Sequence, residues 1–364
     1  MKKRVLFAIQ GEGRGHMTQS LALKEILNNG KFELVGAIIG KSSRRKIPNF
    51  VRDGLEVEIF EIRSPNFITD AQNKGLDIRR SITFNLSLLP KFYGSLKEID
   101  LIIKRYRPDI VINFYEPLIG LYNRFFNPTF KTICIAHQYL TLHSGFKMPN
   151  GFRLERKSLQ FFSALTSYKS SAKLGLSFYE MEDDRKNNVF VIPPLLRPEI
   201  KSLEVRHGDY ILVYLLNKGY KSSIEEWHAK NKSIAIHCFS DDPDVEEELI
   251  FDETLTYHQL NGEKFLNMMS GCMALVSTAG FESVCEAMFL NKPVLMVPVE
   301  GHYEQFVNSR DAYKAGAGVY SDHFDIDKLM DYLKDGARSM NIFKNWANQA
   351  DSKILRLINR VINE

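Results

Sequence analysis

Short apolar segments alternate along the chain with longer segments of helical periodicity. In the longer segments apolar residues recur every three to four positions, the spacing of a helix with one buried face. This alternation predicts parallel sheets covered by helices on both faces. In the first half of the chain the predicted strands are Val5–Ile9, Leu34–Ile39, Val57–Ile62, Ile110–Phe114, Thr132–Ala136, Leu174–Phe178 and Val189–Ile192, and the predicted helices are Thr18–Leu27, Phe92–Arg105 and Phe152–Ala164.

A second series with the same alternation follows residue 208. The Pro-rich segment 193–198 is the best linker candidate, so we expect an amino-terminal domain at 1–200, a second domain at 201–338 and a carboxyl-terminal helix at 339–364. Two doubly wound domains in tandem would leave a cleft at the carboxyl ends of their strands, where ligands generally bind. The predicted strands are Ile211–Leu216, Ser233–Phe239, Met273–Val276 and Val294–Val297, and the predicted helices are Glu263–Met269, Glu282–Leu290, Tyr303–Ala315, Ile326–Leu333 and one long helix at Asn341–Asn363.

Composition narrows the class of protein. With 44% hydrophobic and 25% charged residues among 364, the chain has a globular composition. The net charge of +4 is too small to indicate nucleic-acid binding. The four cysteines lack zinc-site spacing, and the apolar run Val5–Ile9 is too short for the core of a signal peptide. We therefore expect a cytoplasmic protein without a membrane-spanning helix.

A glycine-rich turn, residues 11–16, follows the first predicted strand and opens a helix. Gly13 and Gly15 would let the backbone approach a phosphate closely at the helix N-terminus. A dinucleotide fingerprint would need glycine where this chain has His16, and an acid where the second strand ends in Gly40-Lys41. These departures argue against a nicotinamide-dependent dehydrogenase.

His16 is the most informative residue of this turn. Its position at the mouth of a strand-helix connection and the ordinary pKa of imidazole suit proton abstraction from a hydroxyl. The alternative is a histidine that braces the glycine turn.

A second strand-helix turn lies in the later half of the chain. Thr278, Ala279 and Gly280 are small residues that end one predicted strand, and the amides of Gly280 and Phe281 would be open to a diphosphate. Glu282 and Glu286 follow four residues apart on one helix face. We expect Glu286 to accept the ribose hydroxyls, whereas Glu282 could instead complement the helix dipole.

A polar cluster comes after the next strand. Glu304, Gln305 and Asn308 carry the hydrogen-bonding groups that match the hydroxyls of a hexose. The alternative interpretation is a polar helix start with Glu304 in its first turn.

A set of residues in the later half of the chain resembles the donor-binding signature of GT-B glycosyltransferases, especially the MurG-like and UDP-glucuronosyltransferase-like groups. The set consists of Ala279-Gly280, Glu286, Lys292-Pro293, Val297-Pro298, Gln305, Asn308 and 316–318. The glycine turn with His16 is similar to the amino-domain motif of those families. The resemblance implies two Rossmann-like domains, a nucleotide-sugar donor held by the second domain and an acceptor held by the first. It also implies a carboxyl-terminal helix at 339–364 that crosses back to the first domain, and inversion at the anomeric carbon. It implies no further cofactor.

One departure from that pattern concerns the diphosphate. The first strand of the second domain ends near Asn217 and Lys218 instead of in a Gly-Gly-Ser-type turn. Lys218 is the candidate diphosphate contact there, and the alternative is that this turn makes no such contact. The triplets Asp242-Pro243-Asp244 and Asp325-Ile326-Asp327 are interpreted as an acidic loop and a helix cap, not as metal ligands. Helix amides would then neutralise the charge of the leaving diphosphate, as a cation does in metal-dependent enzymes.

Further candidates lie in the first domain. Glu116 follows a strand; it could orient His16, act as the base or bind acceptor, and an ordinary loop carboxylate is the alternative. His137 and Gln138 end the next strand and are candidates for the acceptor side.

The segments 79–93 and 122–131 are basic and apolar, which suits an anionic membrane surface and a lipid-linked acceptor, although ordinary helix packing is slightly favoured.

The leading hypothesis is a metal-independent hexosyltransferase with a UDP-linked donor. A non-catalytic nucleotide-sugar sensor is the alternative from another class. A UDP-sugar 2-epimerase is disfavoured because no Arg-Pro-Glu-type motif follows Gly11.

Overall fold

The structure, a computed structural model, describes residues 2–28, 30–41, 47–65, 80, 83–85, 88–215, 220–242, 244–336 and 338–363. Internal contacts divide these residues into two compact units. Unit 1 contains the described residues up to Pro198 together with residues 346–363, and unit 2 contains Glu199–Asn345.

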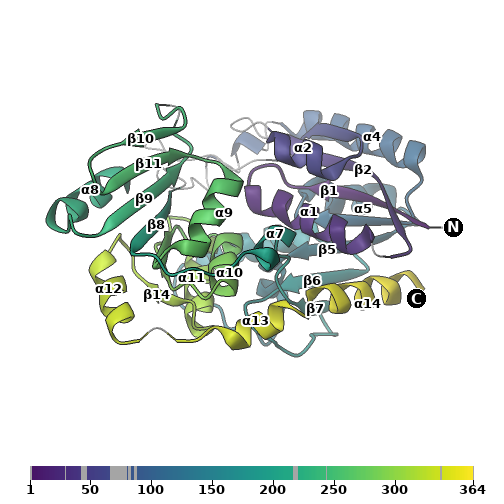
Figure 1. Cartoon of the computed structure of the whole chain (residues 1–364). Helices are drawn as coiled ribbons and strands as arrows, with labels where there is room; N and C mark the ends of the chain where they lie inside the picture. The colour runs from purple at the N-terminus through teal and green to yellow at the C-terminus, as the bar shows by residue number, and fades with distance from the viewer. Residues whose placement is uncertain are drawn as a thin grey trace. The chain divides into compact units, whose positions relative to one another are not determined.

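Unit 1 is built on a seven-stranded parallel sheet with the order β3-β2-β1-β4-β5-β6-β7 (Figure 1). The strand order reverses at β1, so β1 and β4 flank the switch point where ligands of doubly wound sheets bind. The central strands are fully buried because helices cover both faces. The strands are β1 Lys3–Ile9, β2 Phe32–Lys41, β3 Ile59–Arg63, β4 Ile110–Phe114, β5 Lys131–Ala136, β6 Ala172–Leu176 and β7 Val189–Ile192.

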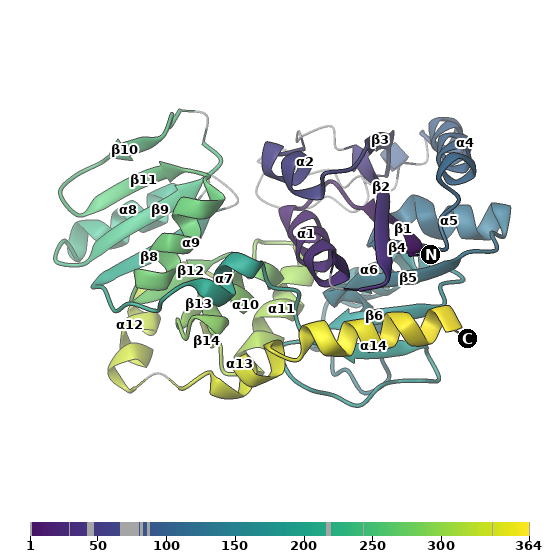
Figure 2. The ribbon, with the colours of Figure 1, turned by 45° about the vertical axis from the view of Figure 1, so that its right-hand side comes forward.

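Helices α4 and α5 bury one sheet face, where Leu6, Ala8, Ile38 and Ile62 form a core with their apolar residues. Helix α14 contacts α1, β5 and β7 of the same unit (Figure 2). The helices of unit 1 are α1 Arg14–Asn28, α2 Asn49–Leu55, α4 Leu89–Tyr106, α5 Pro117–Phe126, the 3-10 helix η1 His137–Leu142, α6 Arg153–Thr166 and α14 Ala350–Asn363.

Unit 2 has a second seven-stranded sheet with the order β10-β11-β9-β8-β12-β13-β14, parallel except for the β10–β11 pair. Its strands are β8 Tyr210–Leu215, β9 Ala235–Ser240, β10 Glu248–Ile250, β11 Leu255–Gln259, β12 Ala274–Ser277, β13 Val294–Met296 and β14 Gly318–Tyr320. Its helices are α7 Pro198–Ser202, α8 Lys221–Lys230, α9 Gly262–Gly271, α10 Phe281–Phe289, α11 Tyr303–Lys314, α12 Ile326–Lys334 and α13 Asn341–Ala347. The first residue of α7 and the last two residues of α13 belong to unit 1.

These two parallel-dominated sheets confirm the predicted fold class, and every strand predicted from the sequence is present. The prediction of one long helix at the carboxyl end was wrong: α13 and α14 are separate helices. The amide of Gln349 donates to the carbonyl of Trp346 in the turn between them, while the Trp346 indole donates to the carbonyl of Ser177 at 2.9 Å. Anchoring this tryptophan in unit 1 fixes the chain where the helix is interrupted.

Candidate functional site

The turn from β12 to α10 has an unusual backbone. Ala279 has φ 59°, in the left-handed region that residues with a side chain seldom adopt. Its carbonyl accepts a hydrogen bond from Asn308 Nδ2 at 3.1 Å. A side chain of α11 therefore holds the strained turn that begins α10.

Two buried polar atoms beside this turn lack hydrogen-bond partners among the described residues. They are Thr278 Oγ1 and Asn308 Oδ1, on side chains that are 0% and 1% exposed. Gly280, the N-cap of α10, supplies no side-chain cap, so the first amides of α10 rely on other acceptors. Because buried polar groups are nearly always hydrogen-bonded, Thr278 Oγ1 and Asn308 Oδ1 are candidate ligand contacts, and the amides at the start of α10 are candidate donors to an anion.

The predicted carboxylates lie on α10 as expected. Phe281 begins the helix and is buried, Glu282 is half-buried in the first turn, and Glu286 is buried one turn later. Burial, followed by the charges of Glu282, Glu286 and Asp311, holds the pKa of the Cys285 thiol well above its usual range. All three carboxylates therefore lie near the Cys285 thiol.

The start of α11 uses part of the predicted hexose cluster internally. Gln305 Oε1 accepts from the amide of Val299 at 2.8 Å, and His302 Nδ1 accepts from the amide of Gln305. Glu304 is half-buried in the first helical turn. Gln305 Oε1 is thus used within the protein, whereas Asn308 Oδ1 is buried without a hydrogen-bond partner among the described residues.

In unit 1, His16 is the third residue of α1 and is buried. Its Nδ1 lies 3.3 Å from Gln19 Oε1, and its ring stacks on that of Tyr115 with centroids 5.6 Å apart. Gly13 and Gly15 lie immediately before it, and a Cβ at Gly13 would meet nothing within 4 Å among the described residues. The glycine turn therefore leaves open space at Gly13 among the described residues.

Glu116 is the N-cap of α5 and is fully buried. Its Oε1 accepts from Ser64 Oγ at 2.5 Å and from the amide of Leu118 at 3.1 Å, while Oε2 has no partner among the described residues. Burial raises the pKa of Glu116 to about 7, and the two hydrogen bonds oppose that rise. A Cβ on Gly40 would lie 2.2 Å from Oε2, so the carboxyl group reaches the end of β2 and does not bond His16.

The acceptor-side candidates lie in η1, directly after β5. His137 Nδ1 is 2.7 Å from the carbonyl of Leu176, and Gln138 Oε1 is buried without a hydrogen-bond partner among the described residues. Gln138 thus presents an unsatisfied acceptor just after the carboxyl end of β5.

Some predicted residues fall elsewhere. Asn217 and Lys218 lie outside the described residues. Asp325 caps α12 as predicted, accepting from the amide of Lys328, and Asp242 accepts from the amide of Asp244. Within the described ranges, no group of three or more His, Cys, Asp or Glu side chains has an arrangement that could hold a metal ion.

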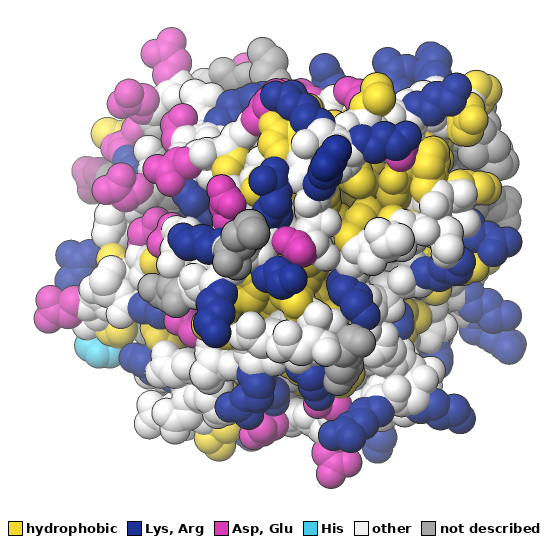
Figure 3. Space-filling view, turned by 90° about the vertical axis from the view of Figure 1, so that its right-hand side faces the viewer, with side chains coloured by type: hydrophobic (Ala, Val, Ile, Leu, Met, Phe, Trp, Pro, Cys, Tyr) yellow, Lys and Arg dark blue, Asp and Glu magenta, His cyan; other side chains and the backbone are white. Residues whose placement is uncertain are grey.

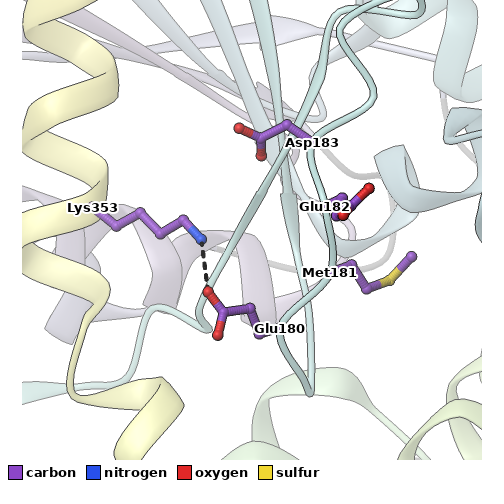
Figure 4. Close-up of a pocket in the computed structure, with 5 residues that line it drawn as sticks. All are labelled: Glu180, Met181, Glu182, Asp183 and Lys353. Carbon is purple, nitrogen blue, oxygen red and sulfur yellow. Dashed lines mark ion pairs between the residues drawn. The ribbon is translucent and has the colours of Figure 1, made fainter.

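An open hollow on unit 1 lies apart from these residues. Three carboxylates, those of Glu180, Glu182 and Asp183, line it with Met181 and Lys353, and Lys353 Nζ is 3.8 Å from Glu180 (Figure 4). Such an acidic lining would repel a nucleotide diphosphate. We therefore do not interpret it as the donor site.

Sequence reasoning missed Tyr115 and Gln19, which both contact His16. Gln19 follows His16 by three residues, a spacing that places the two side chains together on a helix. The sequence therefore contained a spacing from which the contact of Gln19 with His16 could have been predicted. The left-handed backbone of Tyr115, φ 63°, could not have been predicted from the residue type.

The family described as glycosyl transferase family 1 matches residues 3–335. No curated protein sequence matches the chain. The fold is similar to that of the kitacinnamycin glycotransferase, with 14% identity, TM-score 0.67 and 99% of both chains covered.

Two further solved structures carry ligands. The spinosyn rhamnosyltransferase SpnG, complexed with thymidine diphosphate, is 11% identical with TM-score 0.62, and 98% of this chain and 100% of that chain are covered. UGT89C1 of Arabidopsis thaliana, complexed with UDP-L-rhamnose, is 14% identical with TM-score 0.61, and both chains are covered completely. The family match spans most of the chain, and the two sheets are those of the GT-B fold: this protein belongs to glycosyl transferase family 1 and is a transferase that uses a nucleotide-sugar donor.

Proposed function

We propose that the chain transfers a hexose from a UDP-linked donor to a hydroxyl acceptor, with inversion at the anomeric carbon and without a metal ion. The observation that carries the donor half is the strained turn at Ala279, with the unsatisfied atoms Thr278 Oγ1 and Asn308 Oδ1 beside it. The thymidine diphosphate and UDP-L-rhamnose in the SpnG and UGT89C1 structures support a nucleoside diphosphate as the ligand.

The diphosphate would lie at the start of α10. The amides of Gly280 and Phe281 and the hydroxyl of Thr278 would donate to its oxygens, and the positive end of the helix would stabilise the charge that grows as UDP leaves. These groups supply the neutralisation that metal-dependent transferases obtain from a cation. Ribose would bind Glu286, and the hexose would contact Gln305 Nε2, Asn308 Oδ1 and Glu304.

The acceptor hydroxyl would be deprotonated by His16. The resulting oxygen attacks the anomeric carbon as the bond from that carbon to UDP breaks, and the proton stays on the imidazole until UDP and product leave. One displacement of this kind inverts the anomeric configuration. Gln138 and His137 are proposed to contact the acceptor, for which the Arabidopsis enzyme's complex with quercetin offers a small polyhydroxylated example.

Replacing Glu286 tests the donor half. Glu286→Gln and Glu286→Ala should weaken UDP binding by roughly 1–3 kcal/mol, because a charged acceptor of the ribose hydroxyls is lost. Isothermal titration with UDP measures this, with Glu263→Ala, an exposed carboxylate in the first turn of α9, as the control. UDP affinity that is unchanged in folded Glu286→Gln would refute the ribose role.

Helices α4, α5 and α6 present a face that we propose rests on an anionic membrane and gives access to a lipid-linked acceptor. On the side of the molecule that carries α4 and α5, Figure 3 shows hydrophobic side chains gathered among Lys and Arg. No helix of the described residues is long and apolar enough to cross a membrane. The exposed apolar residues of these helices are Tyr93, Leu101, Phe125, Phe126, Leu154 and Phe161, with basic side chains at Lys91, Lys97, Lys104, Arg105, Arg124, Arg153, Arg156 and Lys157 and acidic ones at Glu98, Asp100 and Glu155.

Vesicle sedimentation tests this face. The protein should pellet with vesicles containing phosphatidylserine, remain in solution with pure phosphatidylcholine, and be released by salt, because basic residues and apolar side chains act together. Phe125→Ser with Phe161→Ser should abolish pelleting, whereas Ile250→Ser, at an exposed apolar position in unit 2, should not. Equal pelleting with both lipids, or with neither, contradicts the proposal.

A further inference from the structure

Strand β10 is the outermost strand of the unit 2 sheet (Figure 2). It pairs with β11 on one side, and no strand of the described residues pairs with its other side. The amide of Phe251 donates to the carbonyl of Leu255 of β11. In an antiparallel ladder every second residue bonds the partner strand, so Glu248 and Ile250 point their amides and carbonyls away from β11. These backbone groups form an open edge to which a further strand can bond.

Apolar side chains are exposed on both faces of this edge. Leu249, Ile250 and Phe251 are 43%, 69% and 52% exposed. Successive strand residues point to opposite faces, so Leu249 and Phe251 lie on the face of Tyr257 and Ile250 lies on the other. A helix resting on the sheet would cover one face only, whereas an added strand would cover side chains on both. The distribution of apolar side chains therefore fits a strand.

The chain segment that contains β10 is strongly acidic. Residues 241–253 include eight acidic residues and no basic one, in a chain whose net charge is +4. Two lysines from outside the segment neutralise part of this charge, with Lys264 at 2.8 Å from Glu248 and Lys232 at 3.7 Å from Asp252. Most of the negative charge remains, and it attracts a positively charged partner.

The same charge disfavours a second copy of this chain at the edge. Glu246 and Glu247 are exposed and form no ion pair among the described residues. If two β10 strands paired antiparallel, these carboxylates would lie close to Asp252 and Glu253 of the other copy. Like charges on facing positions destabilise a strand pair. The complementary occupant is therefore a basic segment of a different protein.

We propose that β10 is a docking edge for an extended, lysine- or arginine-rich segment of a partner protein, which adds a strand beside β10. Main-chain hydrogen bonds at Glu248 and Ile250 would hold the segment, and its apolar side chains would contact the three exposed ones of β10. Its basic side chains would lie against the carboxylates of residues 241–253. The inference goes beyond the proposed sugar transfer and does not depend on it.

Fluorescence anisotropy with the full chain tests the charge preference. The probe is a short, capped, labelled peptide in which lysine and valine alternate, compared with one in which glutamate replaces lysine. The lysine peptide should bind at least about 10-fold more tightly at low salt, and its affinity should fall at high salt. Glu246→Lys with Glu247→Lys should remove this preference. Glu204→Lys with Asp209→Lys, the same charge change at exposed positions before β8, should keep it.

Blocking the backbone separates strand addition from attraction by charge alone. Ile250→Pro removes an amide that faces the open edge and leaves the bonds to β11 intact, so it should weaken binding of the lysine peptide by about 10-fold. Methylating alternate backbone nitrogens of the peptide should weaken binding to the unsubstituted protein as much, which keeps the test valid if Ile250→Pro does not fold. Equal binding of the lysine and glutamate peptides, or full affinity for the methylated peptide, overturns the proposal. UDP release in the same samples reports the transfer reaction separately.

Discussion

Replacing His16 with alanine is expected to lower turnover by about 10²- to 10⁴-fold, the usual contribution of a positioned general base. UDP affinity should stay nearly unchanged, because the proposed phosphate and ribose contacts all come from α10 and the turn before it. Parallel assays of UDP release and UDP binding separate the two effects. The split between catalysis and binding is what distinguishes a base from a residue that braces the glycine turn.

His323→Ala is the control for the His16 variant, since the His323 side chain is 79% exposed in unit 2 and has no proposed role. It should match the unsubstituted protein in both assays. If His16→Ala keeps its turnover, His16 is structural. Glu116 would then be the next candidate, because its pKa of about 7 suits proton transfer near neutral pH.

Gly120→Ala should destabilise unit 1 strongly, although alanine is the better helix former. Gly120 lies in α5 against the end of α6, and a Cβ there would be 1.7 Å from the carbonyl oxygen of Leu165. Backbone cannot yield as a flexible side chain can, so we expect a loss at or above about 3 kcal/mol, the upper end of overpacking effects. Thermal unfolding should show a fall in Tm of roughly 6–12 °C.

Gly94→Ala is the matched control for this prediction. Gly94 is also helical, in α4, and a Cβ there would meet nothing within 4 Å among the described residues. This variant should gain about 0.5–1 kcal/mol from helix propensity alone. Equal Tm shifts in the two variants would contradict the close packing of α5 on α6.

Most of the fold could be predicted because the buried strands are continuous apolar runs. Ile110–Phe114 and Val189–Ile192 match the structure at both ends, since both faces of a parallel strand are covered. Three strands were missed. All of β10 is exposed, and β11 and β14 are short, mixed in polarity and close to the sheet edges. Such strands form because they pair with adjacent strands of the sheet, and the local sequence pattern does not show this pairing.

Helix α5 was also missed, although it carried a readable signal. Glu116 followed by Pro117 is an N-cap followed by proline in the first helical position, a recognised helix start. The prediction treated Glu116 only as a candidate functional carboxylate. Its capping bond to Leu118 shows that one carboxyl oxygen has a structural role.

The residues of the candidate site could be predicted from their types and spacing, but the contacts between them could not. Thr278, Gly280 and Glu286 were identified because small residues and a carboxylate follow a strand in a known pattern. The bond from Asn308 to Ala279 joins residues 29 positions apart, and no local spacing encodes it. Tyr115 was not predicted because its ring contact with His16 goes with a left-handed backbone conformation, φ 63°, that the residue type does not indicate.

The central claim is that this protein releases UDP from a UDP-hexose by transferring the sugar to an acceptor hydroxyl. Incubation with UDP-hexoses and a panel of hydroxylated acceptors, followed by quantification of UDP and glycosylated product, measures this directly. The account predicts equal amounts of UDP and of product with inverted anomeric configuration for at least one donor. UDP binding without release from any donor, even as slow hydrolysis, would contradict the account and identify a nucleotide-sugar-binding protein without catalysis.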